Sequence, residues 1–340
     1  MLGIYVCCFI VFPLLLIIPI RRNENVISGK ILNIADSNMI KGMAICFVML
    51  SHLVSSLESV HNITVLRAYT VLGGMGVLLF FFLSGYGLYN GYAHKEPDKV
   101  FVKKRIKNVV YPYVVMKLFF YLVEVGLDKD RFAIQYFVSN FLDWFIVVIL
   151  LEYCIFFVAW ALCKRSEQKL ILYSFIANIV VFIFFVQLGL TERWYNGLML
   201  FPVGMLIARN EDSIAEFFRR KWLIKLIINL VLFSILGVVF VIYKGQLWAD
   251  IVKGIAGISL SIFLCGVFVR YKLESPIMRY VGRDSLYYYI IHLNVMLILE
   301  KIGLTSVVWN FYLTILITIL LVWVFKYFVS CSLKITQLKR

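Results

Sequence analysis

A lysine and a histidine, Lys41 and His52, lie eleven positions apart in the otherwise apolar stretch MIKGMAICFVMLSHLVSSL. A helix turns about 100° per residue, so the two side chains would return to within about 20° of one face, separated by a rise of about 16 Å. That rise is about half the apolar thickness of a bilayer, so Lys41 would lie near one membrane surface and His52 deep above it. An ionisable side chain at that depth is costly and indicates a functional site by default.

Both residues also have structural interpretations. The sequence Asp36-Ser37-Asn38 supplies helix-capping groups, so Lys41 would lie in the first turns and could anchor the helix at the membrane surface. His52 could make an interhelical hydrogen bond. Histidine is nevertheless the side chain best suited to accept and return a proton near neutral pH, and burial disfavours its charged form.

Other polar residues lie in apolar stretches. Ser84 follows three phenylalanines in the glycine-rich GGMGVLLFFFLSGYGLYNGY, where small residues allow either close helix packing or room for a ligand. His292 lies in GRDSLYYYIIHLNVM. Ser84 and His292 are therefore further candidates for lining a cavity. Lys117 and Glu152 would also be buried, and such residues are expected to pair with one another, for example Lys117 with Glu152.

A basic cluster precedes the next apolar stretch, in KVFVKKRIKNVVYPY. Its members include Lys104, Arg105 and Lys107. Such a cluster fixes membrane topology, and it would also attract a phosphate-bearing cytosolic ligand such as coenzyme A.

The composition restricts the fold class. Of the 340 residues, 62% are hydrophobic and 16% charged, and the mean hydropathy is +0.91. This predicts an all-α polytopic integral membrane protein with about ten to eleven transmembrane helices. The predicted spans are 2–20, 39–57, 71–92, 108–126, 144–163, 169–188, 194–208, 222–243, 249–269, 285–301 and 308–329.

The charges indicate topology. Most of the excess that gives a net charge of +15 lies in alternate loops, which places the N-terminus outside and the C-terminus in the cytoplasm of a multi-pass protein of the cell membrane. This distribution argues against nucleic acid as a partner. The seven cysteines show no pairing pattern and the four histidines no ligand spacing, so neither a disulfide framework nor a metal is expected.

Several motifs together resemble the acyltransferase family 3 membrane proteins, which include bacterial O-acetyltransferases acting on cell-surface polysaccharides. Lys41 and His52 in IKGMAICFVMLSH match the family's arginine-or-lysine, ten residues, histidine motif. The segments FFFLSGYGLYNG, KKRIKNVVYPY, WFIVVILLEY and VGRDSLYYYIIH resemble four further family segments in the same order. In the basic loop the family often has arginines three apart, where this chain has Lys104 and Lys107, and lysine lacks the planar fork of arginine.

The resemblance implies an N-terminal span and connector over 1–38 and an acyltransferase membrane domain over 39–340. It implies acetyl-CoA as the acyl donor and a hydroxyl of a surface or envelope glycan, or of a lipid-linked saccharide, as the acceptor. His52 would then be the general base, and Lys41 would support the donor. Lys104, Arg105 and Lys107 would bind the coenzyme A phosphates, with Ser84 and His292 lining the cavity and His52 or Ser84 able to carry an acyl group.

Two other functions fit parts of the sequence. A transporter or flippase for glycans or lipid-linked intermediates is compatible with the glycine-rich spans and the buried charges, although no inverted repeat is visible. The second alternative function is that of a non-catalytic membrane partner in polysaccharide assembly. The sequence does not indicate an oligomeric state or the identity of the acyl group.

Overall fold

The computed structural model describes residues 30–58, 66, 68–128, 141–304 and 306–338, together with Ile4, Tyr5, Cys8, Pro13 and residues 20–22. Eight of the described helices are long and apolar enough to cross a membrane. The predicted all-α polytopic fold is therefore confirmed, whereas the predicted span at 2–20 lies almost entirely outside the described residues. The long helices are α3 (Ile34–Glu58), α4 (Ala68–Tyr92), α6 (Tyr111–Leu127), α8 (Trp144–Leu162), α9 (Glu167–Gln187), α12 (Trp222–Ile242), α13 (Leu247–Arg270) and α16 (Val307–Leu338).

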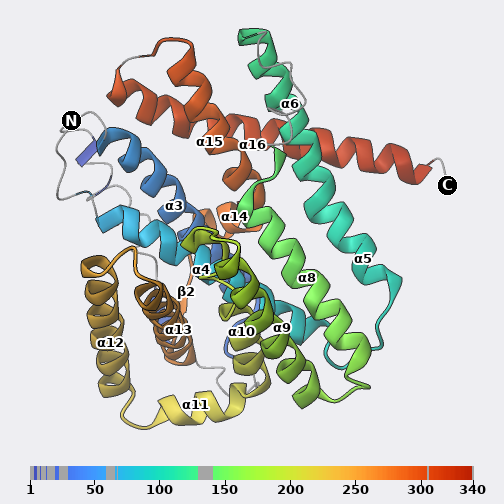
Figure 1. Ribbon diagram of the computed structural model, residues 1–340, viewed down its shortest axis with the longest axis vertical. Helices are drawn as coiled ribbons and strands as arrows, with labels where there is room; N and C mark the ends of the chain where they lie inside the picture. Colours follow the sequence, from blue (N-terminus) through green and yellow to red (C-terminus); the bar gives the residue numbers. More distant parts are fainter. Residues whose placement is uncertain are drawn as a thin grey trace.

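Shorter elements connect these helices. Helix α5 (Lys99–Arg105) carries the basic cluster and runs through a π-helical segment (Ile106–Val110) into α6, so that the three form one continuous apolar span. The remaining elements are α10 (Leu200–Arg209), α11 (Glu211–Arg219), α14 (Pro276–Arg283), α15 (Ser285–Lys301), a short 3₁₀ turn (Glu192–Trp194) and the strands β1 (Ile20–Arg22) and β2 (Tyr271–Leu273). In Figure 1, α12 and α13 lie side by side at one edge of the bundle, and α3 and α4 lie nearer its centre.

Two predicted spans within the described residues are not among the eight long helices: 285–301, which is the 17-residue helix α15, and 194–208. The segment 194–208 begins as irregular backbone, and its helix α10 starts only at Leu200. Ten residues rise about 15 Å, which is too short to cross a bilayer. The turns before α10 include Asn196 and Gly197, which line a cavity, and non-helical backbone is tolerated at membrane depth where it lines a cavity.

Helices α3 and α14 meet at two glycines. A Cβ atom added at Gly282 would lie 1.7 Å from the Asn38 carbonyl oxygen, and one added at Gly42 would lie 2.0 Å from the Met278 carbonyl oxygen. The missing side chains therefore allow backbone-to-backbone contact. This contact fixes α14, and with it the start of α15, beside the Lys41 end of α3.

Ion pairs and a small sheet fasten the same end of the bundle. Strand β1 pairs antiparallel with β2, with Arg21 opposite Lys272. Lys272 also donates to the buried Asp36 carboxylate at 2.7 Å, and Lys326 of α16 donates to Asp284 at 2.7 Å. Because a buried carboxylate needs a partner, these contacts hold α3, α15 and α16 in place.

Glu211, at the start of α11, links that helix to the residues preceding α3. Its Oε1 atom accepts from the Ile31 backbone N–H at 3.3 Å. Burial raises the pKa of Glu211 from 4.5 to about 7, and the Ile31 N–H and the charge of Lys30 oppose this only partly. Between those two pH values the folded state binds the extra proton, so the contribution to stability is greatest below pH 4.5 and is lost as the pH rises through 7.

We therefore expect Glu211→Gln, which stays neutral, to unfold at a higher temperature than the unsubstituted protein at about pH 8.5, with a smaller difference at about pH 5. Thermal unfolding in detergent at both pH values measures this. Glu216→Gln on the same helix is the control, because Glu216 is exposed and pairs with Arg219 at the surface. If the unfolding temperatures of all three proteins changed equally between the two pH values, the prediction would be contradicted.

Candidate functional site

Two histidines from distant parts of the chain meet inside the bundle. The Nδ1 atom of His52 on α3 lies 2.8 Å from the Nε2 atom of His292 on α15, and the two rings are within 11° of parallel. His292 is 1% exposed, and its Nδ1 atom lies 2.7 Å from the Tyr288 carbonyl oxygen, one turn earlier on α15. Two of the residues selected from the sequence thus form one hydrogen-bonded pair.

The hydrogen bonds determine which ring atoms carry protons. A carbonyl oxygen only accepts, so the Nδ1 atom of His292 must carry a proton. In the neutral ring the Nε2 atom of His292 is then an acceptor, and it accepts a hydrogen bond from the Nδ1–H group of His52. This leaves the Nε2 atom of neutral His52 unprotonated. The pair therefore presents His52 as a base and holds its ring in one orientation.

His52 opens onto a cavity of about 590 Å³, referred to here as the His52 cavity. His292 is behind His52 and is not among the residues that line it. The walls come from α3, α4, the start of α8, α13, α15 and the segment around the 3₁₀ turn. The lining residues are Val48, Ser51, His52, Thr70, Gly73, Gly74, Val77, Leu78, Asp143, Trp144, Glu192, Arg193, Asn196, Gly197, Lys253, Tyr289 and Leu293.

Charged groups from the 3₁₀ turn and from α13 line this cavity. Lys253 pairs with Glu192 at 3.2 Å. Burial opposes ionisation of Glu192, but the charge of Lys253 and the hydrogen bond that Lys253 donates hold the pKa of Glu192 below the ordinary value. The charge of Arg193 acts on His52, and the buried Nδ2 atom of Asn196 has no hydrogen-bond partner among the described residues. These groups can bind a polar, hydroxyl-bearing ligand next to the base.

Sequence reasoning did not identify Glu192, Arg193 or Lys253 as site residues. One signal was present, since Lys253 lies inside the predicted span 249–269 and an ionisable residue within a span indicates function. Arg193 gave no comparable signal. Its place at the cavity depends on the irregular segment before α10, which periodicity does not predict.

A second cavity, of about 190 Å³, surrounds Lys41 and is called the Lys41 cavity. It is lined by Asn38, Lys41, Phe80, Ser84, Asn108, Val109, Phe145, Ile149, Tyr153, Gly282, Arg283, Ser285, Leu286 and Tyr289. Ser84 therefore lies with Lys41, in a different cavity from the histidine pair. The glycine-rich helix α4 is unbroken and contributes to both cavities, through Ser84 to this one and through Gly73 to the other.

Of the three residues selected from the basic cluster, only Arg105 lies beside the Lys41 cavity. Arg105 is partly buried, its charge acts on Lys41, and its guanidinium lies 5.0 Å from the centre of the Tyr153 ring, which lines the cavity. Lys104 and Lys107 are exposed, and neither lines a cavity described here. Arg283 also lines the Lys41 cavity, although the sequence analysis did not select it.

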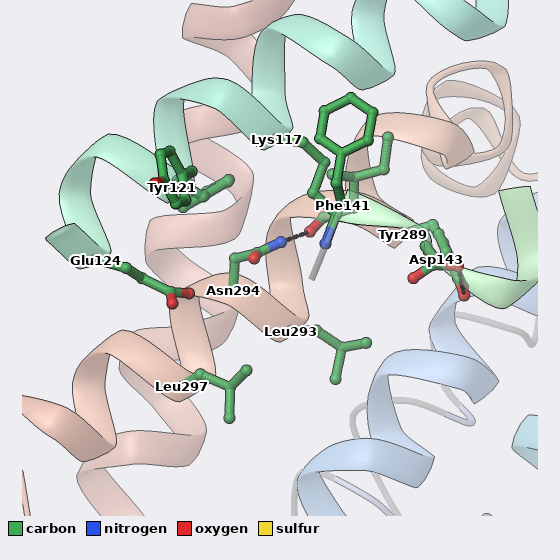
Figure 2. Close-up of a pocket in the computed structure, with 11 residues that line it drawn as sticks. Lys117, Tyr121, Glu124, Phe141, Asp143, Tyr289, Leu293, Asn294 and Leu297 are labelled. Carbon is green, nitrogen blue, oxygen red and sulfur yellow. Dashed lines mark hydrogen bonds between the residues drawn. The ribbon is translucent and has the colours of Figure 1, made fainter. Parts of the chain in front are cut away.

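Figure 2 shows a third cavity, of about 150 Å³, between α6 and α15. Lys117, Glu124 and Asp143 supply its charged groups. The expected pairing of Lys117 with Glu152 is wrong, because Glu152 faces α9, where it accepts from Asn178 at 3.1 Å. Glu124, which lines the same cavity as Lys117, pairs with Lys301 at 3.3 Å.

Comparison with known proteins gives one match. A family model described as an acyltransferase domain, that of the acyltransferase 3 family, matches residues 34–327. The matched range begins with α3 and ends within α16, so it contains the histidine pair and all three cavities. No curated protein and no solved structure matches the chain.

Proposed function

Since this chain belongs to the acyltransferase 3 family and is a multi-pass membrane acyltransferase, we propose that it transfers acetyl from acetyl-CoA to a hydroxyl of a cell-surface or envelope polysaccharide. The observation that carries the proposal is the histidine pair, which leaves an unprotonated nitrogen of His52 at the wall of the larger cavity. A hydroxyl must lose its proton to attack a thioester, and a neutral imidazole is suited to take it.

In the proposed reaction the Nε2 atom of His52 takes the proton of the acceptor hydroxyl. The hydroxyl oxygen then forms a bond to the thioester carbonyl carbon, the carbon–sulfur bond breaks, and the coenzyme A thiolate receives the proton back from His52. The products are the acetyl ester and free coenzyme A. His292 stabilises the transient imidazolium, because its Nε2 atom accepts a hydrogen bond from the Nδ1–H group of His52.

The donor is proposed to enter on the Lys41 side. Coenzyme A carries phosphates, and Lys41, Arg105 and Arg283 supply positive charge at or beside the Lys41 cavity. Lys104 and Lys107 would then attract the donor at the surface. The excess of basic residues in loops at this end supports a cytoplasmic location for it, with the N-terminus outside and the C-terminus inside. The acceptor would bind in the His52 cavity beside Glu192, Arg193 and Lys253.

The arrangement of the cations gives a kinetic prediction. We expect Arg105→Gln and Arg283→Gln each to raise KM for acetyl-CoA about tenfold while changing kcat little, because each loses one charged contact with a bound phosphate. Lys107→Gln is the matched control and should have a smaller effect, since Lys107 is exposed. Release of the coenzyme A thiol by purified protein measures both constants. A larger effect at Lys107 than at Arg105 would contradict this placement of the donor.

The experiment that tests the function compares three strains: wild type, a deletion of this protein, and the deletion complemented with His52→Ala. Acetate released from the surface glycan by mild alkali is measured alongside the amount of polymer. We expect acetate to fall in both altered strains while the polymer remains. Loss of surface polymer with unchanged acetylation would instead favour a transporter or flippase.

A further inference from the structure

Tyr289 on α15 lies where the three cavities meet. Its side chain lines the His52 cavity, the Lys41 cavity and the smaller cavity of Figure 2, and no other described residue lines the first two together. The side chain is buried, its hydroxyl donates to Oδ1 of Asp143 at 3.0 Å, and its ring centre lies 4.7 Å from that of Phe145. Tyr289 is thus a wall shared by the proposed donor and acceptor sites.

The two larger cavities follow one another along the same helices. On α15, Ser285 lines the Lys41 cavity and Leu293 lines the His52 cavity, with Tyr289 one turn from each. The distance from Ser285 to Leu293 along the helix is about 12 Å. Helix α3 also contributes to both cavities, through Lys41 at one end and His52 towards the other. In the proposed reaction, the thioester of a donor held on the Lys41 side would therefore reach His52 past Tyr289.

The wall at this point is aromatic. The Phe145 ring packs edge-on against Phe80 and Phe81, with ring centres 6.0 and 5.5 Å apart. Asp143, which holds the Tyr289 hydroxyl, also accepts from the Phe145 backbone N–H at 3.0 Å as the cap of α8. The Tyr289 ring is consequently held by one hydrogen bond to the cap of α8 and by ring contacts with Phe145 and His292.

We propose that Tyr289 is the positioning residue that keeps the donor and acceptor sites apart and admits the acyl group to His52. Its ring closes the passage between the two cavities, and the hydrogen bond to Asp143 holds it closed. This inference rests on the proposed function. Its chemical purpose is to keep water on the acceptor side away from the thioester, because water would attack the carbonyl carbon, break the carbon–sulfur bond and release acetic acid and the coenzyme A thiol.

The first test measures hydrolysis of acetyl-CoA by the purified chain without an acceptor. Tyr289→Phe keeps the ring but loses the hydrogen bond, and we expect it to raise the hydrolysis rate about threefold to tenfold, with a larger increase for Tyr289→Ala. Tyr287→Phe is the matched control on the same helix and should leave the rate unchanged. Hydrolysis at the wild-type rate in both Tyr289 variants, with transfer to the acceptor retained, would overturn the proposal.

The second test does not depend on activity. Ser84→Cys places a thiol in the Lys41 cavity, and a charged, membrane-impermeant thiol reagent is applied to oriented proteoliposomes from either side. Labelling above the parent protein is expected from one side only, and adding Tyr289→Ala should extend it to both sides. One-sided labelling in the double variant would overturn the separation of the sites. If no acceptor supports consumption of acetyl-CoA by the wild type, the proposed function fails while this labelling still tests Tyr289.

Discussion

His52→Ala is expected to lower acetyl transfer about 10³-fold with normal protein levels, because the acceptor hydroxyl loses the group that takes its proton. The structural reason is the direction of the hydrogen bonds: the Tyr288 carbonyl fixes the proton on His292, and His292 in turn fixes the proton on His52. The measurement is the rate of acetylated product formed per folded molecule, with release of coenzyme A as a second readout.

Two substitutions at His292 test the proposed role of the histidine pair at intermediate levels of activity. His292→Ala removes the acceptor for the Nδ1 proton of His52, and we expect a loss of about tenfold, smaller than for His52→Ala. The glutamine side-chain oxygen in His292→Gln can still accept a hydrogen bond from the Nδ1–H group of His52, so this variant should recover part of the rate. His94→Ala is the control, because His94 is exposed and pairs with Glu167 away from both cavities. Full activity in His52→Ala would refute the proposed base.

The helical period predicted part of this site. Lys41 and His52 are on one continuous helix, as the eleven-residue spacing indicates, and the fold class follows from the apolar spans. His292 could be selected because an ionisable residue within an apolar span is costly. The contact between His52 and His292 could not be predicted, because it depends on how α15 crosses α3 and the period describes only the angle around one helix.

The sequence also does not predict that the His52 cavity and the Lys41 cavity are separate. Ser84 and His52 are both polar residues within apolar helices, and hydropathy does not distinguish their depths relative to each other. Their separation is a consequence of an aromatic wall built from α4, α8 and α15, which lie far apart in the sequence. The same applies to Arg283, whose position at the Lys41 cavity requires the close packing of α14 on α3.

That packing leads to the largest structural effect that we expect, from Gly282→Ala. The added Cβ atom would lie 1.7 Å from the Asn38 carbonyl oxygen and 2.6 Å from the Gly42 backbone nitrogen. Both are backbone atoms, so no side chain can rotate away and α14 must move from α3. Such overpacking typically costs about 1–3 kcal/mol, and at a backbone contact we expect the upper end of that range or more.

Gly87→Ala is the matched control for Gly282→Ala. It makes the same chemical change within a helix, but apart from the adjacent backbone of its own helix no described heavy atom lies within 4 Å of the added Cβ, and alanine favours a helix over glycine by about 1 kcal/mol. Thermal unfolding in detergent should therefore show a lower Tm for Gly282→Ala and an unchanged or higher Tm for Gly87→Ala. Because Asn38 and Gly282 both line the Lys41 cavity, the Gly282→Ala protein that does fold should also bind acetyl-CoA more weakly. Equal Tm values for the two variants would mean that α3 and α14 are not in backbone contact, and Arg283 would then lose its place at the donor cavity.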